Sequence, residues 1–403
     1  PAPRAARPKT SLLNMRRTLR IPQSPLLQLS HTQRRASSDQ ANPSFTYRLA
    51  AAASKKSQFP RRPKLNRDYF LYTSVHTDKQ SSPFLHSYKR QSGEDAFFVS
   101  IIGGSKHRVA FGVADGVGGW NDQGVDPSHF SQGLCGLMAG TAYSWRTTGS
   151  TIEKALSPQG LLQKAYDAVL AQPDIVAGSS TACLGVVDDA GYLETTNLGD
   201  SGYLIISPGR ITFRSAAQTH AFNTPYQLAK IPPTYQTQYS IFGGALQYSE
   251  TPSQADLDRH KLSHGDIVIF ATDGVWDNLS AQNILQLVTV IMERYGYWSF
   301  SNGADGAETV LNHNHVSAIP WEIEHSRGVE SSFLPSLIAT EVMKIAKISS
   351  LDNGRSGPFA QEMRARYPEA QWRGGKIDDI AVVVCVPVQE SGDNDESPIK
   401  ANT

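Results

Sequence analysis

Cysteine is scarce in this 403-residue sequence, and long apolar runs are absent. The three cysteines, Cys135, Cys183 and Cys385, lie far apart in apolar segments, so their spacing predicts neither a zinc site nor a disulfide framework. We interpret them as small buried hydrophobes in a reducing compartment. No run approaches the roughly 18–20 apolar residues that a membrane-spanning helix requires, and we expect no membrane span.

Acidic residues are nearly missing from one end of the chain, which reveals a strong charge asymmetry. Residues 1–67 hold 15 Lys and Arg and one acid, Asp39, whereas residues 68–403 hold 23 Lys and Arg against 36 acids. A nucleic-acid-binding protein would be expected to show the reverse balance in its folded body. We therefore expect no nucleic acid among the partners.

The N-terminal arm is basic and amphipathic. Residues 1–38 contain eight Lys and Arg and no acid. Leu12, Met15 and Leu19 fall on one face of a predicted helix, with arginines on another face. This composition is typical of a mitochondrial targeting segment and predicts a location in the mitochondrial matrix. A disordered basic tail is the alternative.

Composition divides the chain into three parts. Residues 1–67 are predicted to be the targeting segment and a linker, largely disordered, with no core residue before about Tyr69. Residues 68–390 are long enough for one large domain, and residues 391–403 are predicted to be a disordered tail. Within the domain, residues 299–333 are polar and lack a clear period, which is typical of a loop insertion.

The folded part alternates short β-rich runs with helical stretches. Two predicted strands, Thr181–Asp188 and Tyr192–Leu198, flank a tight connection, which indicates a β-hairpin. Adjacent hairpins with helices between them indicate antiparallel sheets covered by helices, an α+β fold rather than a doubly wound parallel sheet. The other predicted strands are Phe97–Ile102, Val109–Ala114, Gly202–Ser207, Arg210–Arg214, Ile267–Thr272 and Ile380–Pro387, and the predicted helices are His129–Ser144, Pro158–Leu170, Ala281–Tyr295 and Leu334–Ile348.

Acidic residues gather in four patches, each beside an apolar run that predicts a buried strand. Buried carboxylates need cations to offset their loss of hydration. Carboxylate oxygens are hard ligands that suit Mg²⁺ or Mn²⁺ better than zinc. The pattern therefore predicts a binuclear metal site and metal-assisted hydrolysis. The patches are Gly93–Asp95, Ala114–Gly119, Thr272–Asp277 and Asp378–Asp379.

The pair Asp115-Gly116 is the strongest of these elements. An aspartate at a strand end can bridge two cations, and the glycine after it lets a backbone carbonyl approach a metal. A dinucleotide-binding interpretation fails because the glycine pattern that starts at Gly116 ends in Asn121. Asp273 and its following glycine repeat the design, and Asp277 faces the same site if the turn becomes helical.

The segment Gly199-Asp200-Ser201-Gly202 resembles the nucleophile loop of trypsin-like serine proteases. The match covers only four residues, and no histidine in an Ala-Ala-His-Cys context precedes it. A catalytic triad requires a matched histidine and aspartate as well. A serine hydrolase acting through Ser201 is therefore a minor alternative.

Taken in order, the motifs resemble the type-2C, metal-dependent protein Ser/Thr phosphatases. The resemblance runs from about residue 69 to residue 388, and its six elements in the right order make it highly specific. Asp115–Trp120 and Gln218–Leu228 are similar to the mitochondrial branch of the family, which is implicated in the control of ubiquinone synthesis. The six elements are Glu94-Asp95, Ala114–Gly119, Gly178–Ala182, Leu198–Ser201, Thr272–Asp277 and Asp378–Val382.

The resemblance implies a four-layer αββα sandwich with a metal pair in the cleft between two antiparallel sheets. It implies hydrolysis of phosphoserine and phosphothreonine by water that two Mg²⁺ or Mn²⁺ ions activate, with a third, weaker ion site and no covalent phosphoenzyme. The partners are then phosphoprotein substrates, and we expect a monomer.

The resemblance also assigns a role to each site residue. Asp115 bridges the metals, and Gly116 supplies a carbonyl ligand. The remaining assignments are Asp273 and Asp378 as ligands of the other metal, Glu94 and Asp95 as holders of metal-bound waters, Asp200 and Asp277 with Asp273 as the third-ion site, and Arg90 as the phosphate-binding arginine.

One departure concerns the leaving group. Some family members carry a histidine directly after the Asp-Gly pair as a proposed general acid, and here that position is Val117. His220 is a candidate for this general acid, but only because its side chain has the required chemistry. Other branches also lack this histidine, so we expect activity. A catalytically inactive relative that binds partners through the same fold is the main alternative.

Overall fold

Two antiparallel sheets form the centre of the protein. The computed structural model describes residues 44–56, 70–72, 92–145, 155–233, 248–303, 306–321 and 333–390. One sheet has six strands, in the order β2 (Phe70–Tyr72), β1 (Ser44–Ser54), β17 (Ile380–Glu390), β14 (Ile267–Ala271), β8 (Gly202–Ser207) and β9 (Arg210–Arg214). The other has five, in the order β13 (Asp256–Lys261), β7 (Tyr192–Leu198), β6 (Ala182–Val187), β4 (Ser105–Ala114) and β3 (Ala96–Ile102).

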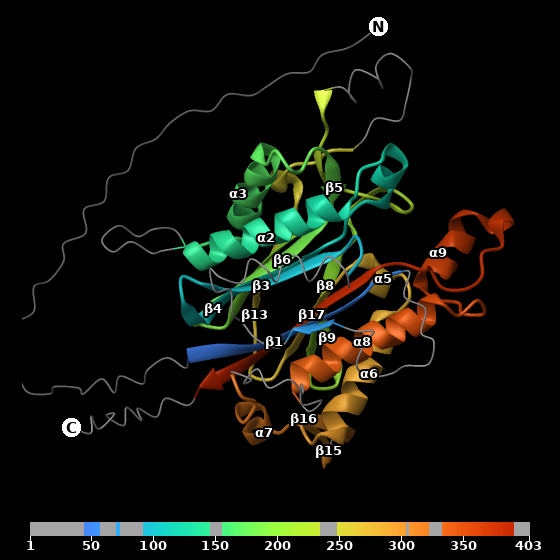
Figure 1. Cartoon of the computed structure of the whole chain (residues 1–403). Coiled ribbons are helices and arrows are strands. Elements are labelled where there is room, and N and C mark those ends of the chain that lie inside the picture. The colour runs from blue at the N-terminus through green and yellow to red at the C-terminus, as the bar shows by residue number, and fades with distance from the viewer. Residues whose placement is uncertain are drawn as a thin grey trace, which may run out of the picture. The chain divides into compact units, whose positions relative to one another are not determined.

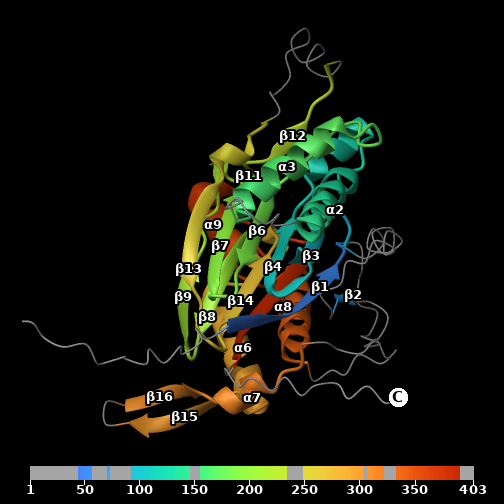
Figure 2. The same ribbon diagram turned by 90° about the vertical axis from the view of Figure 1, so that its left-hand side faces the viewer.

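Helices cover the outer face of each sheet (Figure 1). Helices α2 (Ser128–Ser144) and α3 (Pro158–Ala171) pack on the five-stranded sheet, and α6 (Ala281–Arg294) and α8 (Leu334–Ser350) pack on the six-stranded sheet. The view in Figure 2 shows the two helix pairs on opposite sides of the strands. A third hydrophobic cluster fills the space between the sheets. The predicted four-layer αββα sandwich is confirmed.

Helix starts follow local sequence signals. Ser157 accepts a hydrogen bond from the amide of Gly160 at the start of α3, where Pro158 occupies the first turn. Ser280 accepts one from the amide of Asn283 and completes a capping box at the start of α6. These caps satisfy amides that the helix itself leaves without partners.

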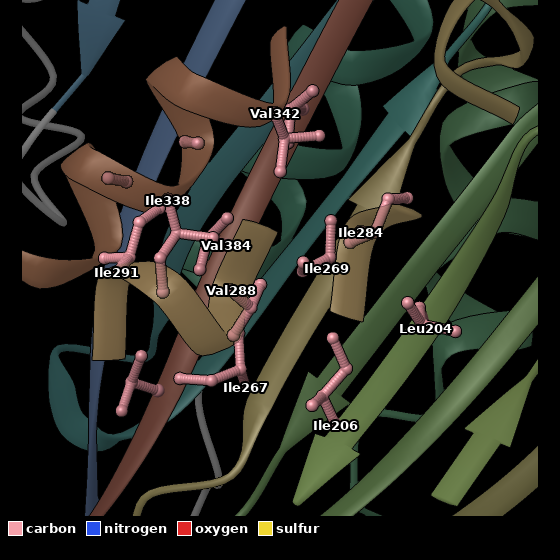
Figure 3. Packing of buried hydrophobic residues seen from close by; sticks show 14 of the residues in the cluster. Leu204, Ile206, Ile267, Ile269, Ile284, Val288, Ile291, Ile338, Val342 and Val384 are labelled. Carbon is pink, nitrogen blue, oxygen red and sulfur yellow. The ribbon is translucent and has the colours of Figure 1, made fainter. Parts of the chain in front are cut away.

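Successive side chains of a strand point to opposite faces of its sheet, so one strand contributes to two hydrophobic clusters. In β17, Val382 and Val384 face the cluster beneath α6 and α8, whereas Val383 and Cys385 face the cluster between the sheets. Figure 3 shows Val384 with Ile338 of α8 and with residues of α6 and neighbouring strands. Because both faces are covered, the strand is apolar throughout. Full burial of each such side chain contributes about 1.5–3 kcal/mol.

Strand β1 corrects the predicted domain boundary. Residues 1–67 were expected to be a largely disordered leader and linker, but Ser44–Ser54 pairs with β17 over eleven positions and is buried. Its alanines, Ala50 to Ala53, lie at most 1% exposed because both faces are packed. Residues 1–43, which include the predicted targeting helix, and the predicted tail 391–403 lie outside the described residues.

The predicted loop insertion is also partly ordered. Residues 298–311 form a hairpin of β15 (Trp298–Gly303) and β16 (Gly306–Leu311), followed by α7 (His313–Ser317). Trp298 is buried but Phe300, on the same face of β15, is 62% exposed, so only the base of the hairpin packs against the core. A strand that is exposed along most of its length gives no hydrophobic period to detect. Residues 322–332 lie outside the described part.

The remaining elements are short and lie in the connections. They are β5 (Gly178–Ser180), β10 (Thr219–Ala221), β11 (Thr224–Pro225), β12 (Leu228–Lys230), α5 (Asp273–Trp276), α9 (Pro358–Arg366) and three short 3-10 helices, Gly118–Gln123, Pro252–Gln254 and Pro368–Ala370. Among the helices that the structure describes, none combines the length and the apolar character needed to cross a membrane.

Candidate metal centre

Three aspartates converge from strands of both sheets. Asp115 follows β4, Asp200 lies between β7 and β8, and Asp273 begins α5 directly after β14. One carboxylate oxygen of each lies within 4.8 Å of the others. The strand ends of the two sheets therefore place three residues, separated by up to 158 positions in sequence, in one group.

The group has the properties of a cation site. Oδ1 of Asp200 and Oδ1 of Asp273 are buried and have no hydrogen-bond partner among the described residues. Burial, reinforced by Asp95 and other nearby carboxylates, raises the pKa of Asp115 well above its usual value. Burial and the charge of Asp273 likewise raise the pKa of Asp200. An all-oxygen donor set with uncompensated negative charge fits Mg²⁺ or Mn²⁺.

Backbone hydrogen bonds fix the turn that carries Asp115. Its amide donates to Oγ1 of Thr181 at 3.1 Å, and the amide of Thr181 donates to the carbonyl of Asp115 at 3.0 Å. Gly116 pairs with Ser180 in an isolated β-bridge. A Cβ atom at Gly116 would lie 2.6 Å from the carbonyl oxygen of Glu94, so only glycine fits. The Gly178–Ala182 motif thus has a positional role that its sequence alone did not indicate.

A second layer of carboxylates supports this turn. Asp95 is buried and its Oδ2 accepts a hydrogen bond of 2.8 Å from Thr272 Oγ1, while burial and the charge of Asp379 raise its pKa. Asp379 Oδ2 accepts from the amide of Glu94 at 2.8 Å, and Oδ1 accepts from the amide of Lys56. The segment after β1 therefore contacts the site, although it was predicted to be linker.

The predicted water-holding residues are differently engaged. The Glu94 carboxylate pairs with Lys56 Nζ at 2.8 Å and accepts from Asn121 Nδ2 at 2.7 Å. Asp95 bonds Thr272 through one oxygen. Whether either carboxylate also orders water near a metal stays a prediction.

Lys376 is the site residue that sequence reasoning missed. Its Nζ lies 2.5 Å from Asp273 Oδ2, 2.7 Å from Asp277 Oδ2 and 3.2 Å from Asp378 Oδ2. In the sequence, Gly374-Gly375-Lys376 is followed by Ile377 rather than by Ser or Thr, so it does not match a Walker A motif and indicates no phosphate-binding role for the lysine. Asp273 and Asp277 lie 103 and 99 residues earlier in the sequence, so no local pattern indicated that the lysine shares a site with them.

The carboxylates around Lys376 have different pKa values. Burial alone would raise the pKa of Asp273, but the ammonium of Lys376 outweighs burial and lowers it. Burial and the charge of Asp273 raise the pKa of Asp277 to about 7. The same two causes raise the pKa of Asp378 to about 6. Asp273 is therefore the most readily ionised member of the set.

The structure places the other predicted site residues unequally. Asp200 lies in the group of three with Asp115 and Asp273, whereas Asp277 and Asp378 lie beside Lys376. Arg90 lies outside the described residues. The predicted role of Arg90 in binding the phosphate therefore stays a prediction.

Ser201 and His220, which were considered as a nucleophile and as a general acid, both have hydrogen-bonding partners in the structure. Ser201 is 1% exposed, and its hydroxyl lies 2.8 Å from Thr181 Oγ1, so it lacks the exposed, histidine-activated geometry of a serine nucleophile. His220 Nε2 lies 2.9 Å from Glu250 Oε1, and its ring stacks on Tyr226 and Tyr248. Neither arrangement supports a serine hydrolase or a histidine general acid.

Comparison with known proteins agrees with the fold. The chain is 37% identical over 328 residues to the protein phosphatase PTC7 homolog fig of Drosophila simulans, covering 81% of this chain and 87% of the relative. It is 41% identical over 297 residues to the PTC7 homolog of Danio rerio, covering 73% and 81%. The solved photosystem II phosphatase PBCP is 25% identical, with a TM-score of 0.50 over 75% of this chain and 94% of that one. No protein-family model matches the chain.

Proposed function

The chain belongs to the PTC7 group of type-2C protein Ser/Thr phosphatases, and from this premise we propose that it is a mitochondrial enzyme with a binuclear Mg²⁺ or Mn²⁺ centre. Its activity as a protein Ser/Thr phosphatase follows from the family. The ion number, the ligand set and the location are the proposal.

One observation carries the metal proposal. Asp115, Asp200 and Asp273 bring three carboxylate oxygens within 4.8 Å of one another, and two of these residues keep a buried oxygen without a hydrogen-bond partner. A module that only binds partners has no physical reason to keep uncompensated carboxylates together. The arrangement supports a functional cation site over an inactive one.

The proposed ligands are Asp115 and the Gly116 carbonyl for one ion, and Asp115, Asp273 and Asp378 for the other. When bound, two divalent cations supply an acidified water and neutralise the charge that develops on the phosphate. The chain holds Asp115 in position through the Thr181 pairing. It keeps Asp273 ionised through Lys376, so that this carboxylate is ready to bind a cation.

The substrates are proposed to be phosphoproteins, and Arg90 is proposed to bind the phosphate through a bidentate fork. The mitochondrial location rests on the basic, acid-free arm of residues 1–38. The link to ubiquinone synthesis rests on the resemblance to the mitochondrial branch. Residues 1–40 fused to a fluorescent reporter should enter mitochondria. A reporter that stays in the cytosol would contradict the proposed location but not the proposed activity.

Turnover of p-nitrophenyl phosphate and of a phosphothreonine peptide by the full chain tests the proposal. We expect hydrolysis with Mn²⁺, its loss with EDTA, and its loss in Asp273→Asn. The matched control is Asp167→Asn, which removes an exposed carboxylate on α3 that bonds only to a neighbouring glutamine side chain in the described structure. Hydrolysis that is indifferent to EDTA in folded protein would overturn the metal centre.

A further inference from the structure

We propose that Lys376 is a built-in cation that takes the place of a third metal ion between Asp273 and Asp277, so that this enzyme holds two ions rather than three. The inference rests on the proposed function, because it concerns the same acidic site. It departs from the third-ion site predicted on Asp200, Asp273 and Asp277.

The contacts of the ammonium carry the proposal. Lys376 Nζ lies 2.5 Å from Asp273 Oδ2 and 2.7 Å from Asp277 Oδ2, which are distances of tight, charge-assisted hydrogen bonds. The lysine side chain is only 16% exposed, and the Phe359 ring centroid lies 5.4 Å from Nζ. A lysine that bridges a buried and a half-buried carboxylate in this way already supplies the positive charge that an ion there would supply.

The backbone of Lys376 is fixed to the helix that carries both acids. The amide of Lys376 donates to Asn278 Oδ1 at 3.0 Å, and Asn278 Nδ2 donates to the carbonyls of Lys376 and Gly274 at 2.9 Å each. Asn278 is fully buried and directly follows Asp277. A Cβ atom at Gly375 would lie 2.2 Å from the carbonyl oxygen of Ser349, so this loop approaches α8 closely. The lysine is therefore held in place rather than free to leave.

The two carboxylate oxygens of Asp273 have different surroundings. Oδ2 is taken by Lys376, whereas Oδ1 is buried without a partner, as is Oδ1 of Asp200. A cation bound by Asp273 and Asp277 would meet the ammonium at close range, and like charges repel strongly where water is excluded. No ion pair in the described structure joins Asp115 or Asp200 to a cationic side chain, so a cation there meets no ammonium in contact with its ligands. Asp378, at 3.2 Å from Nζ, is the most weakly held of the lysine's partners and stays able to bind an ion.

Calorimetric titration of Mn²⁺ into the metal-free full chain tests the proposal. We expect two ions per chain in the wild type, three in Lys376→Met and two in Lys376→Arg, which keeps the positive charge. The matched control is Lys106→Met, because Lys106 pairs with Glu390 at 3.1 Å on the surface. Three ions in the wild type, or two in Lys376→Met, would overturn the role of the lysine.

A second variant keeps the test decisive if Lys376→Met does not fold. Asp277→Asn should leave two ions in an otherwise wild-type chain, because Asp277 serves the lysine and not a metal. Loss of one ion in Asp277→Asn would overturn the proposal. Failure of the proposed function has a different result, namely no Mn²⁺ binding and no Mn²⁺-dependent turnover in the wild type.

Discussion

The acidic site has two halves that balance their charge in different ways. Around Asp115 and Asp200 the carboxylates are half-buried, Oδ1 of Asp200 has no hydrogen-bond partner, and no ion pair among the described residues reaches either side chain. Around Asp277 and Asp378, Lys376 contacts each carboxylate within 3.2 Å. The difference teaches that the carboxylate of Asp277 already has a protein cation beside it, whereas those of Asp115 and Asp200 have none in contact, although both halves look alike in sequence.

The largest expected effect comes from removing a ligand in the half without a lysine. Asp115→Asn should lower Mn²⁺-dependent turnover by roughly 10²–10³-fold, as expected when a residue that stabilises the transition-state charge is lost. Steady-state hydrolysis of p-nitrophenyl phosphate measures it, with circular dichroism to confirm the fold. Asp167→Asn should retain wild-type turnover. Wild-type activity in Asp115→Asn would contradict the comparison.

In the half with the lysine, loss of Lys376 should lower the stability of the metal-free protein. Lys376→Met removes the only contacting ammonium that the described structure places among Asp273, Asp277 and Asp378, and breaking a buried ion pair costs about 3–5 kcal/mol. Urea unfolding of the metal-free protein should show a loss of this size, and saturating Mn²⁺ should recover most of it. An unchanged midpoint would mean that the lysine does not compensate these acids.

Metal addition to the wild type should stabilise the protein through Asp115, the proposed shared ligand of both ions. At a Mn²⁺ concentration of 100 times the dissociation constant, the free energy of unfolding should rise by about 2.7 kcal/mol per site. Thermal melts with Mn²⁺ and with EDTA measure this rise. Asp115→Asn should show a much smaller rise. A rise as large in that variant as in the wild type would place the ions elsewhere.

The smallest effect concerns pH. The pKa of Asp115 is raised by burial, and that of Asp378 is raised to about 6 by burial and the charge of Asp273. Asp378 therefore carries a proton in most molecules at pH 5.5, which must leave before it binds Mn²⁺, and it is ionised at pH 8. The raised pKa of Asp115 acts in the same direction. From Asp378 alone, the dissociation constant for Mn²⁺ should be roughly fourfold larger at pH 5.5, with proton release on binding. Calorimetry in buffers of different ionisation enthalpy measures both, and equal constants at the two pH values would contradict the assignment.

Much of the fold was predictable because β-rich runs and the turn residues between them can be recognised locally, as in the Asp189-Ala190-Gly191 connection before Tyr192. Tyr192–Leu198 and Gly202–Ser207 match the predicted strands at both ends, and β14 differs from its prediction by one residue. Strand β1 was not predictable from its pattern. Its four consecutive alanines have low strand propensity, and its basic surroundings resemble a leader. Only its pairing with β17 reveals it.

The site was predictable to a similar extent. Asp115 and Asp273 each precede a glycine after a buried run, a local signal that sequence reasoning can detect. The role of Lys376 depends on a loop that Asn278 ties to α5, about 100 residues earlier in the chain. The same long-range packing put Asp200 in the group of three and Asp378 beside the lysine. Such contacts have no local pattern.

Anomalous diffraction at the manganese edge from Mn²⁺-loaded crystals of the full chain tests the central claim most directly. The account predicts manganese peaks within ligand distance of Asp115, with Lys376 still between Asp273 and Asp277 and no peak at that position. A manganese peak between Asp273 and Asp277, with the lysine displaced, would contradict it.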